Sequence, residues 1–258
     1  MKIDWQAFTA PKLGNSPAEN EDAFQPRLRR RRYGLTEPFS CAIADGATES
    51  SFSGLWASLV VRRLRRSVAE PSLGRPSQSF AEIQADRRKE GKSKTLPWFA
   101  EEKVRKGAFT SLTWLNIRQS NPPMDSGGEW KALAMGDSNL FQVRGDQIIV
   151  TFPVESSVDF GNSPFLLPSN PALLPKMWPY AHERGGDWIV GDFFLLMTDA
   201  IAGWFLHALE DGIPLNALLK ELSFNNFQQF NDWLGTVRHQ HAIKNDDTTL
   251  TWIRIVDN

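Results

Sequence analysis

The sequence predicts a protein of the α+β class. Strands and helices occur in clumps along the chain rather than in strict alternation, which favours mixed layers over a doubly wound parallel sheet. Two stretches carry this prediction: residues 131–152 are rich in strands and turns, and residues 203–237 hold three successive helical segments. No internal repeat is visible in the sequence. We expect residues 1–258 to form a single domain.

The first half of the chain predicts a strand followed by a helix. The segment "FSCAIA" (39–44) is short, apolar and ended by Asp-Gly, which is typical of a buried strand. Residues 53–70 predict a helix with Ser53 as its N-cap and an apolar face opposite a run of arginines. Residues 71–97 are rich in Pro, Ser, Gly and charge, which predicts a surface excursion. A helix that turns into a strand around residues 109–117 follows.

The second half predicts strands, then helices, then a last strand. Residues 131–152 hold two turn signals between apolar runs, which predicts a meander of antiparallel strands. Residues 153–187 predict an irregular crossing, and residues 187–200 predict one buried strand that ends in an acid. Helical segments follow over residues 203–237, and an alternating strand closes the chain over residues 245–256.

Composition and charge narrow the classes of function. The formal net charge of -1 gives no overall attraction to nucleic acid or to anionic membranes. No stretch approaches the ~20 apolar residues that a membrane helix needs, and residues 1–14 lack the apolar core of a signal peptide. The single cysteine, Cys41, lies inside an apolar run and predicts an inert packed thiol in a reducing compartment. We therefore expect a soluble, cytoplasmic protein without nucleic-acid or membrane partners.

Acidic residues stand beside predicted strands at four places. Glu21 and Asp22 lie in "NEDAF", Asp45 follows "CAIA", Asp199 follows "FFLLMT" and Asp246 precedes "TTLTWIRI". Each acid alone is better explained as a turn or cap residue than as a metal ligand. Carboxylates that meet at one edge of a core repel one another unless a cation lies between them. Such oxygen ligands suit Mg²⁺ and Mn²⁺, and two such ions sharing a carboxylate form a hydrolytic centre for phosphate esters.

The order and context of these acids resemble the metal-dependent serine/threonine protein phosphatases of type 2C, the PPM family, particularly its bacterial members. The resemblance is carried, in the family's order, by "NEDAF", "AIADGATESSFSGLWAS", "LAMGDSNLFQVRGDQI", "FFLLMTDAIAGWF" and "KNDDTTLTWIRI". These segments are similar to the family's Glu-Asp, Asp-Gly, Gly-Asp-Ser, Ser/Thr-Asp-Gly and Asp-Asn-x-Thr motifs. The resemblance implies a four-layer α-β-β-α sandwich, in which two antiparallel sheets pack face to face and helices flank them.

The resemblance also implies two Mn²⁺ or Mg²⁺ ions in a cleft at one end of the sandwich. The implied metal ligands are Glu21, Asp22, Asp45, Gly46, Asp199 and Asp246. Asp45 would bridge the ions, and the glycine after it would offer its carbonyl. Asp199 and Asp246 would bind one ion, whereas Glu21 or Asp22 would bind or orient the other through water. With Asp45, Asp199 and Asp246 as catalytic residues, a metal-activated water would hydrolyse phosphoserine and phosphothreonine in proteins that a serine/threonine kinase modifies.

The chain departs from the family pattern at several positions. The family usually follows Asp-Gly with one residue and then Gly-Gly, whereas this chain has Ala47, Thr48 and Glu49. Glu49 is either a further contact of the site or a solvated acid. Ala200 follows Asp199 where the family has glycine. Pro17 stands where eukaryotic members carry a phosphate-binding arginine. The arginines of residues 27–32 either replace that arginine or form a solvated basic loop.

Two other functions stay open from the sequence. A phosphatase-like scaffold or regulatory binding module, with weak or no catalysis, would explain the altered residues after Asp-Gly. A metal-dependent nuclease is disfavoured, because no basic track extends beyond the short arginine run. No acid for a third metal is evident in the segment before "GAFTS".

Overall fold

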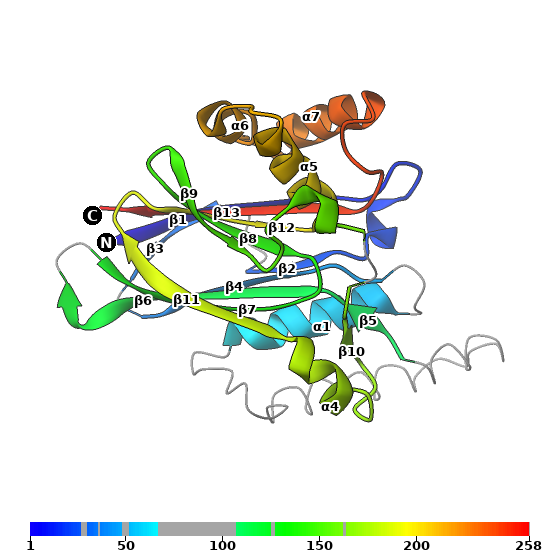
Figure 1. The fold of residues 1–258 in the computed structure, drawn as a ribbon, viewed down its shortest axis with the longest axis horizontal. Coiled ribbons are helices and arrows are strands. Elements are labelled where there is room, and N and C mark those ends of the chain that lie inside the picture. Colours follow the sequence, from blue (N-terminus) through cyan, green and yellow to red (C-terminus); the bar gives the residue numbers. More distant parts are fainter. Residues whose placement is uncertain are drawn as a thin grey trace.

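A computed structural model describes residues 1–26, 30–35, 37–47, 52–66, 107–124, 127–161 and 164–257. The surface excursion expected over residues 71–97, and the helix expected just after it, lie outside the described residues, as do Thr48 and Glu49. The described elements form two antiparallel sheets with helices on both outer faces (Figure 1). This arrangement confirms the predicted α+β class and the layered sandwich.

The first sheet joins the two ends of the chain. Its strands, in spatial order, are β3 (Arg30–Gly34), β1 (Lys2–Ala10), β13 (Thr248–Val256), β12 (Phe193–Met197), β8 (Asn139–Arg144) and β9 (Gln147–Phe152). β1 pairs with β13 along its whole length, from Lys2 opposite Val256 to Ala10 opposite Thr248. The two termini therefore lie side by side at one end of the sheet (Figure 1).

The second sheet contains the strand that leads to Asp45. Its strands, in spatial order, are β11 (His182–Ile189), β7 (Gly127–Met135), β6 (Leu112–Met124), β4 (Phe39–Ala44) and β2 (Ala23–Gln25). Every residue of β4 is buried, as its apolar sequence predicts. A further pair of short strands, β5 (Phe109–Thr110) and β10 (Leu167–Pro168), lies beside the end of β4.

Helices cover the outer face of each sheet. The second sheet is covered by α1 (Ser53–Arg66), whereas α5 (Asp199–Glu210), α6 (Leu215–Glu221) and α7 (Phe227–His239) lie over the first (Figure 1). The connection between β9 and β11 contains the short helix α4 (Leu174–Met177) and the 3₁₀ turns η2 (Ser157–Asp159) and η3 (Trp178–Tyr180), and η1 (Pro17–Glu19) precedes β2. Among the described residues, none of the helices has the length and apolar character needed to cross a membrane.

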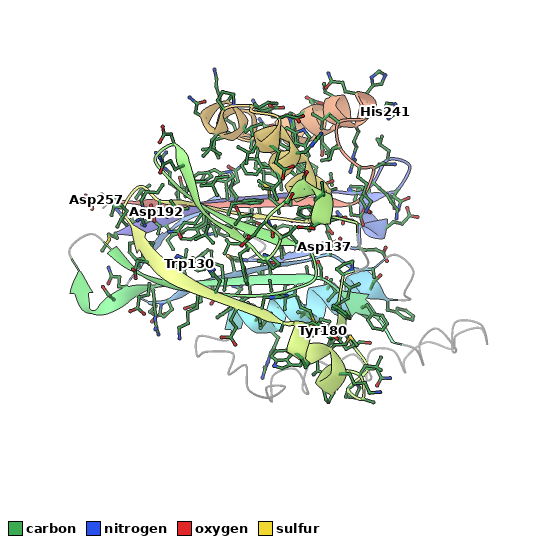
Figure 2. All side chains as sticks on the ribbon, in the orientation of Figure 1. Trp130, Asp137, Tyr180, Asp192, His241 and Asp257 are labelled. Carbon is green, nitrogen blue, oxygen red and sulfur yellow. The ribbon has the colours of Figure 1, made fainter. Side chains whose placement is uncertain are left out.

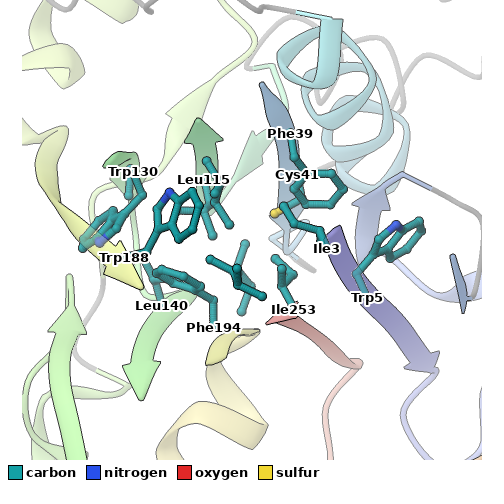
Figure 3. Packing of buried hydrophobic residues seen from close by; sticks show 14 of the residues in the cluster. Ile3, Trp5, Phe39, Cys41, Leu115, Trp130, Leu140, Trp188, Phe194 and Ile253 are labelled. Carbon is teal, nitrogen blue, oxygen red and sulfur yellow. The ribbon is translucent and has the colours of Figure 1, made fainter. Parts of the chain in front are cut away.

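Three apolar layers hold these elements together. The central layer lies between the two sheets and contains Ile3, Cys41, Trp130 and Phe194 among its members (Figure 3). Fully burying side chains of this size stabilises the fold by ~1.5–3 kcal/mol each. Burial also raises the pKa of the Cys41 thiol, which fits the prediction of an inert packed residue. The other two layers lie between each sheet and its covering helices.

The chain crosses between the sheets at two turns where the sequence predicted continuous pairing. The turn at 136–138 leads from β7 in one sheet to β8 in the other, so residues 131–152 are not one meander and only β8 and β9 form a hairpin. The stretch 187–200, predicted as one strand, is likewise divided between β11 and β12. The prediction was wrong because both sheets are covered on both faces, so apolar periodicity does not indicate to which sheet a strand belongs.

Candidate functional site

Acidic residues from five separate segments face one another at one end of the sandwich. Asp22 precedes β2, Asp45 follows β4, Asp199 begins α5 and Asp246 precedes β13. Asp137, in the turn between β7 and β8, joins them (Figure 2). The pKa of Asp45 is raised well above its usual value, first by burial and then by the charges of Asp22, Asp199, Asp137 and Asp246. The structure thus brings four of the predicted acids close enough to Asp137 and to one another for their charges to interact. We call these five residues, Asp22, Asp45, Asp137, Asp199 and Asp246, the acid cluster.

Two threonines donate hydrogen bonds to one carboxylate oxygen of Asp22. Its Oδ2 accepts hydrogen bonds from Thr249 Oγ1 (2.7 Å) and from Thr198 Oγ1 (3.1 Å). Its Oδ1 is buried and has no hydrogen-bond partner among the described residues. Burial raises the pKa of Asp22 well above its usual value against the opposing effect of the Thr249 hydrogen bond, and the nearby charge of Asp247 adds to the rise. Asp22 therefore presents one free oxygen inside the acid cluster.

Backbone contacts fix Asp45 and Gly46 at the end of β4. The carbonyl oxygen of Asp45 accepts hydrogen bonds from Ser111 N–H (2.8 Å) and Thr110 Oγ1 (2.7 Å). A Cβ at Gly46 would lie 2.7 Å from the carbonyl carbon of Ser53, closer than real Cβ atoms come. The glycine after Asp45 is therefore required by the close approach of the first residue of α1.

Asp199 and Asp246 share one lysine. Lys244 Nζ lies 3.0 Å from Asp199 Oδ2 and 2.7 Å from Asp246 Oδ2. Burial works against the charged ammonium, but the charge of Asp199 and the hydrogen bonds to both acids raise the pKa of Lys244 above its usual value. Asp199 Oδ1 is buried without a partner among the described residues. Two predicted ligands thus approach each other closely, with an ammonium group between them.

Glu21 forms hydrogen bonds to α1 and to the loop before β13. Its carboxylate accepts a hydrogen bond from Ser53 Oγ, and its backbone N–H donates to Asp247 Oδ2 at 2.6 Å. Ser53 was predicted as an N-cap, but it is the first residue of the helix and its hydroxyl binds Glu21 instead. Asp247 is buried and also accepts a hydrogen bond from Lys12 N–H at 2.8 Å. It therefore holds the loop after β1 next to Glu21.

Asp137 is a site residue that was not predicted from the sequence. Burial and the charge of Asp199 raise its pKa from an ordinary 3.8 to about 6. The next residue, Ser138, places its Oγ 2.5 Å from Ser111 Oγ, which connects this turn to the segment that holds Asp45. The available signal was the segment "LAMGDSNLF", which predicted a turn between strands and not a carboxylate of the site.

Whether one of the arginines after β2 takes the place of the arginine replaced by Pro17 stays a prediction, and the structure describes only the strand pairing of those in β3. In β3, Arg30 pairs with Gln6 and Arg32 pairs with Asp4, toward the start of β1. The acids lie at the other end of this strand, where Ala10 pairs with Thr248. Arg27 and Arg29 lie outside the described residues.

The acids fit a hard divalent cation by chemistry, but they are not gathered into a ready-made coordination sphere. In the described part of the chain, no three His, Cys, Asp or Glu side chains are arranged so that they could hold a metal ion. The donors are all carboxylate oxygens, which Mg²⁺ and Mn²⁺ prefer. Asp22 Oδ1 and Asp199 Oδ1 are buried with no partner among the described residues, and a cation would satisfy both.

Comparisons with known proteins identify the fold. No protein-family model matches the chain, and no curated protein matches it. Among solved structures, PppA, described as a key regulatory component of T6SS in Pseudomonas aeruginosa, is 18% identical with a TM-score of 0.58, and the match covers 98% of this chain and 97% of that one. The catalytic domain of the serine/threonine phosphatase PstP, in complex with two manganese ions, is 15% identical with a TM-score of 0.56, and 99% of each chain is covered.

A third match is the serine/threonine phosphatase Stp1 from Staphylococcus aureus, which is 12% identical with a TM-score of 0.55 and is aligned over 98% of this chain and 95% of its own. The chain therefore has the fold of the bacterial type-2C serine/threonine phosphatases. This confirms the resemblance at the level of the fold.

Proposed function

We propose that the protein is a metal-dependent phosphatase that hydrolyses phosphoserine and phosphothreonine in proteins. The observation that supports this most is the convergence of acids from distant segments on Asp45. Gathering carboxylates in a partly buried site opposes their ionisation, so the arrangement is costly unless a bound cation offsets it. The shared fold with a phosphatase that holds two manganese ions supports the same function.

Four of the acids would hold the ions in this proposal. Asp45 would be shared by two ions, with the carbonyl of Gly46 as a further ligand. Asp199 and Asp246 would hold one ion, and the free Oδ1 of Asp22 would face the other. Two Mn²⁺ or Mg²⁺ ions bound there would supply Lewis acidity and a water of lowered pKa.

The residues around the acids would position them for this chemistry. Glu21, fixed by Ser53 and by the Asp247 carboxylate, would orient water near the ions. Thr198 and Thr249 hold Oδ2 of Asp22 and thereby turn its other oxygen toward the site. A threonine hydroxyl has one hydrogen to donate, and both of these hydroxyls donate it to the same oxygen of Asp22.

The test is hydrolysis of p-nitrophenyl phosphate and of a phosphothreonine peptide by the whole chain, with EDTA, Mn²⁺ or Mg²⁺. We expect activity only with metal. Asp45→Asn and Asp199→Asn should each lower kcat/KM by roughly 100-fold or more, because each removes a ligand charge. Asp146→Asn, an exposed acid in the turn between β8 and β9, should leave activity unchanged. A folded wild-type protein that is inert with every divalent ion would contradict the proposal.

A phosphatase-like scaffold is the second candidate function, and one observation favours it. Lys244 already contacts Asp199 and Asp246 and offsets part of their charge, which helps the fold to keep these acids together without a metal. The description of the structural neighbour PppA as a regulatory component points the same way. In that case Mn²⁺ would neither bind nor activate, and a phosphoprotein would bind without being hydrolysed.

The substrate class follows from the proposed reaction. We expect phosphoproteins modified by a serine/threonine kinase as partners, and the cytoplasm as the location. The lone cysteine, packed between the sheets, is compatible with a reducing compartment.

A further inference from the structure

Lys244 occupies an unusual position for a lysine in a site that would bind cations. It lies in the loop between α7 and β13, and its Nζ contacts one oxygen each of Asp199 and Asp246. The same loop is anchored by Arg238, whose guanidinium donates to the carbonyl oxygens of Pro11 (2.9 Å) and of Asp246. The anchored backbone therefore keeps the lysine beside the two acids.

The ammonium and a divalent ion would need the same oxygen atoms. A lysine ammonium is a compact cation with three donors, and it satisfies carboxylates much as a small metal ion does. While it contacts Asp199 Oδ2 and Asp246 Oδ2, those two oxygens are not available to a metal. The side chain of Lys244 is 61% exposed, so its flexible stem can move toward solvent without a large packing cost.

We propose that Lys244 is an internal cation that competes with the divalent metal for Asp199 and Asp246. This inference rests on the proposed function, since it assumes that a metal binds these acids. In the absence of metal the lysine holds the two acids together and offsets their charge. When metal binds, the lysine is displaced, and the contacts it loses weaken the affinity of the ion that uses these two ligands.

The test compares Mn²⁺ binding to wild type and to Lys244 variants of the whole chain, by titration calorimetry after removal of metal with EDTA. Lys244→Met keeps the stem and removes the charge, and we expect it to bind one Mn²⁺ about 10- to 100-fold more tightly, as the loss of two charged hydrogen bonds implies. Lys244→Arg keeps a cation and should retain weak binding. Lys220→Met, an exposed lysine of α6, is the control and should match wild type.

Thermal unfolding gives a second readout that a purely structural lysine would not produce. In EDTA, Lys244→Met should melt below wild type, because Asp199 and Asp246 lose their only contacting ammonium among the described residues. In saturating Mn²⁺ the order should reverse. Should Lys244→Met fail to fold, Lys244→Gln serves for the same measurements.

The outcomes separate this inference from the proposed function. If Mn²⁺ binds wild type, Lys244→Met and Lys244→Arg with one affinity, the lysine does not compete, and the inference falls while the phosphatase proposal stands. If Mn²⁺ binds none of the folded proteins, the proposed function fails, and the competition fails with it.

Discussion

The hydroxyl of Thr249 donates a hydrogen bond of 2.7 Å to Asp22, which lies 227 residues earlier in the chain. The bond connects the loop before β2 to the last strand, β13. Thr249 in turn contacts Thr9 Oγ1 at 2.8 Å, and Thr9 accepts from Asn20 Nδ2 at 2.9 Å. A chain of hydrogen bonds thus runs from β1 through β13 to the partly buried carboxylate of Asp22. It fixes one oxygen of Asp22 and leaves the other free for the site.

Replacing Thr249 by valine should destabilise the protein. The substitution keeps the shape of the side chain but removes a donor to a partly buried carboxylate, at a cost of ~1–3 kcal/mol. The measurement is urea unfolding of metal-free protein. Thr251→Val is the matched control in the same strand, because Thr251 Oγ1 is buried without a partner among the described residues. That control should be neutral or stabilising, and equal losses in both variants would contradict the role of Thr249.

Much of the candidate site could be predicted because its acids follow or precede strongly apolar strands. β4 and β12 are short apolar runs that end near Asp45 and Asp199, and a carboxylate directly after a buried strand is conspicuous in a sequence. The joining of such strands at one end of two packed sheets came from the resemblance to a known family and not from periodicity.

The features that were not predicted depend on contacts between distant segments. β1 was not recognised as a strand, since six of its nine residues are buried and its sequence shows no regular alternation. Asp137 became a site residue only because its turn crosses from one sheet to the other. Lys244 stands two residues before Asp246, and nothing in local sequence indicates that it also contacts Asp199.

Gly46→Ala should be strongly destabilising. A Cβ there would meet Ser53 C at 2.7 Å and Gly54 N at 2.9 Å, and backbone atoms of a helix cannot move as easily as a flexible side chain. We expect a loss of about 1–3 kcal/mol or more in the free energy of unfolding, measured with urea.

Gly235→Ala is the matched control for this substitution. Gly235 lies in α7, and a Cβ there would meet nothing within 4 Å. Because alanine is the better helix former, this variant should gain ~0.5–1 kcal/mol. A Gly46→Ala protein as stable as wild type would show that the loop after Asp45 can move away from α1.

Asp192→Asn should destabilise the end of the sandwich that lies away from the acid cluster (Figure 2). Asp192 is fully buried and accepts hydrogen bonds from Arg144 Nη2 (2.7 Å), Arg144 Nε (2.8 Å) and Gln142 Nε2 (2.8 Å). The Arg144 side chain is 38% exposed, so water can solvate the guanidinium once the charge of Asp192 is removed, and we expect a loss of ~1–3 kcal/mol from the weakened hydrogen bonds.

Glu129→Gln serves as the control for Asp192→Asn. Glu129 pairs with Arg118 at 2.9 Å, but both side chains are more than 40% exposed, so the change should cost no more than ~1 kcal/mol. Activity per folded molecule should be unchanged in both variants, because neither lies near Asp45. A loss of kcat in folded Asp192→Asn would show that the two ends of the sandwich are coupled.

The stability of the metal-free protein should fall as pH rises from about 4 to about 6. Asp137 has an ordinary pKa of 3.8 and a pKa of about 6 in the folded protein, so the folded state holds the proton more tightly than the unfolded state does. Its favourable contribution is complete below pH 3.8 and is lost as pH passes about 6. Burial shifts Asp22 and Asp45 in the same direction, so they add to this slope.

Asp137→Asn should make this pH dependence shallower, because the amide does not titrate. At pH 7 the variant should be more stable than metal-free wild type by roughly 1–3 kcal/mol, since it no longer has to ionise a carboxyl beside Asp199. Urea unfolding in EDTA at several pH values between 4 and 7.5 measures both effects. Asp146→Asn is the control and should keep the wild-type slope, because Asp146 is exposed. If Asp137→Asn and wild type show the same slope, Asp137 is solvated and does not belong to the acid cluster.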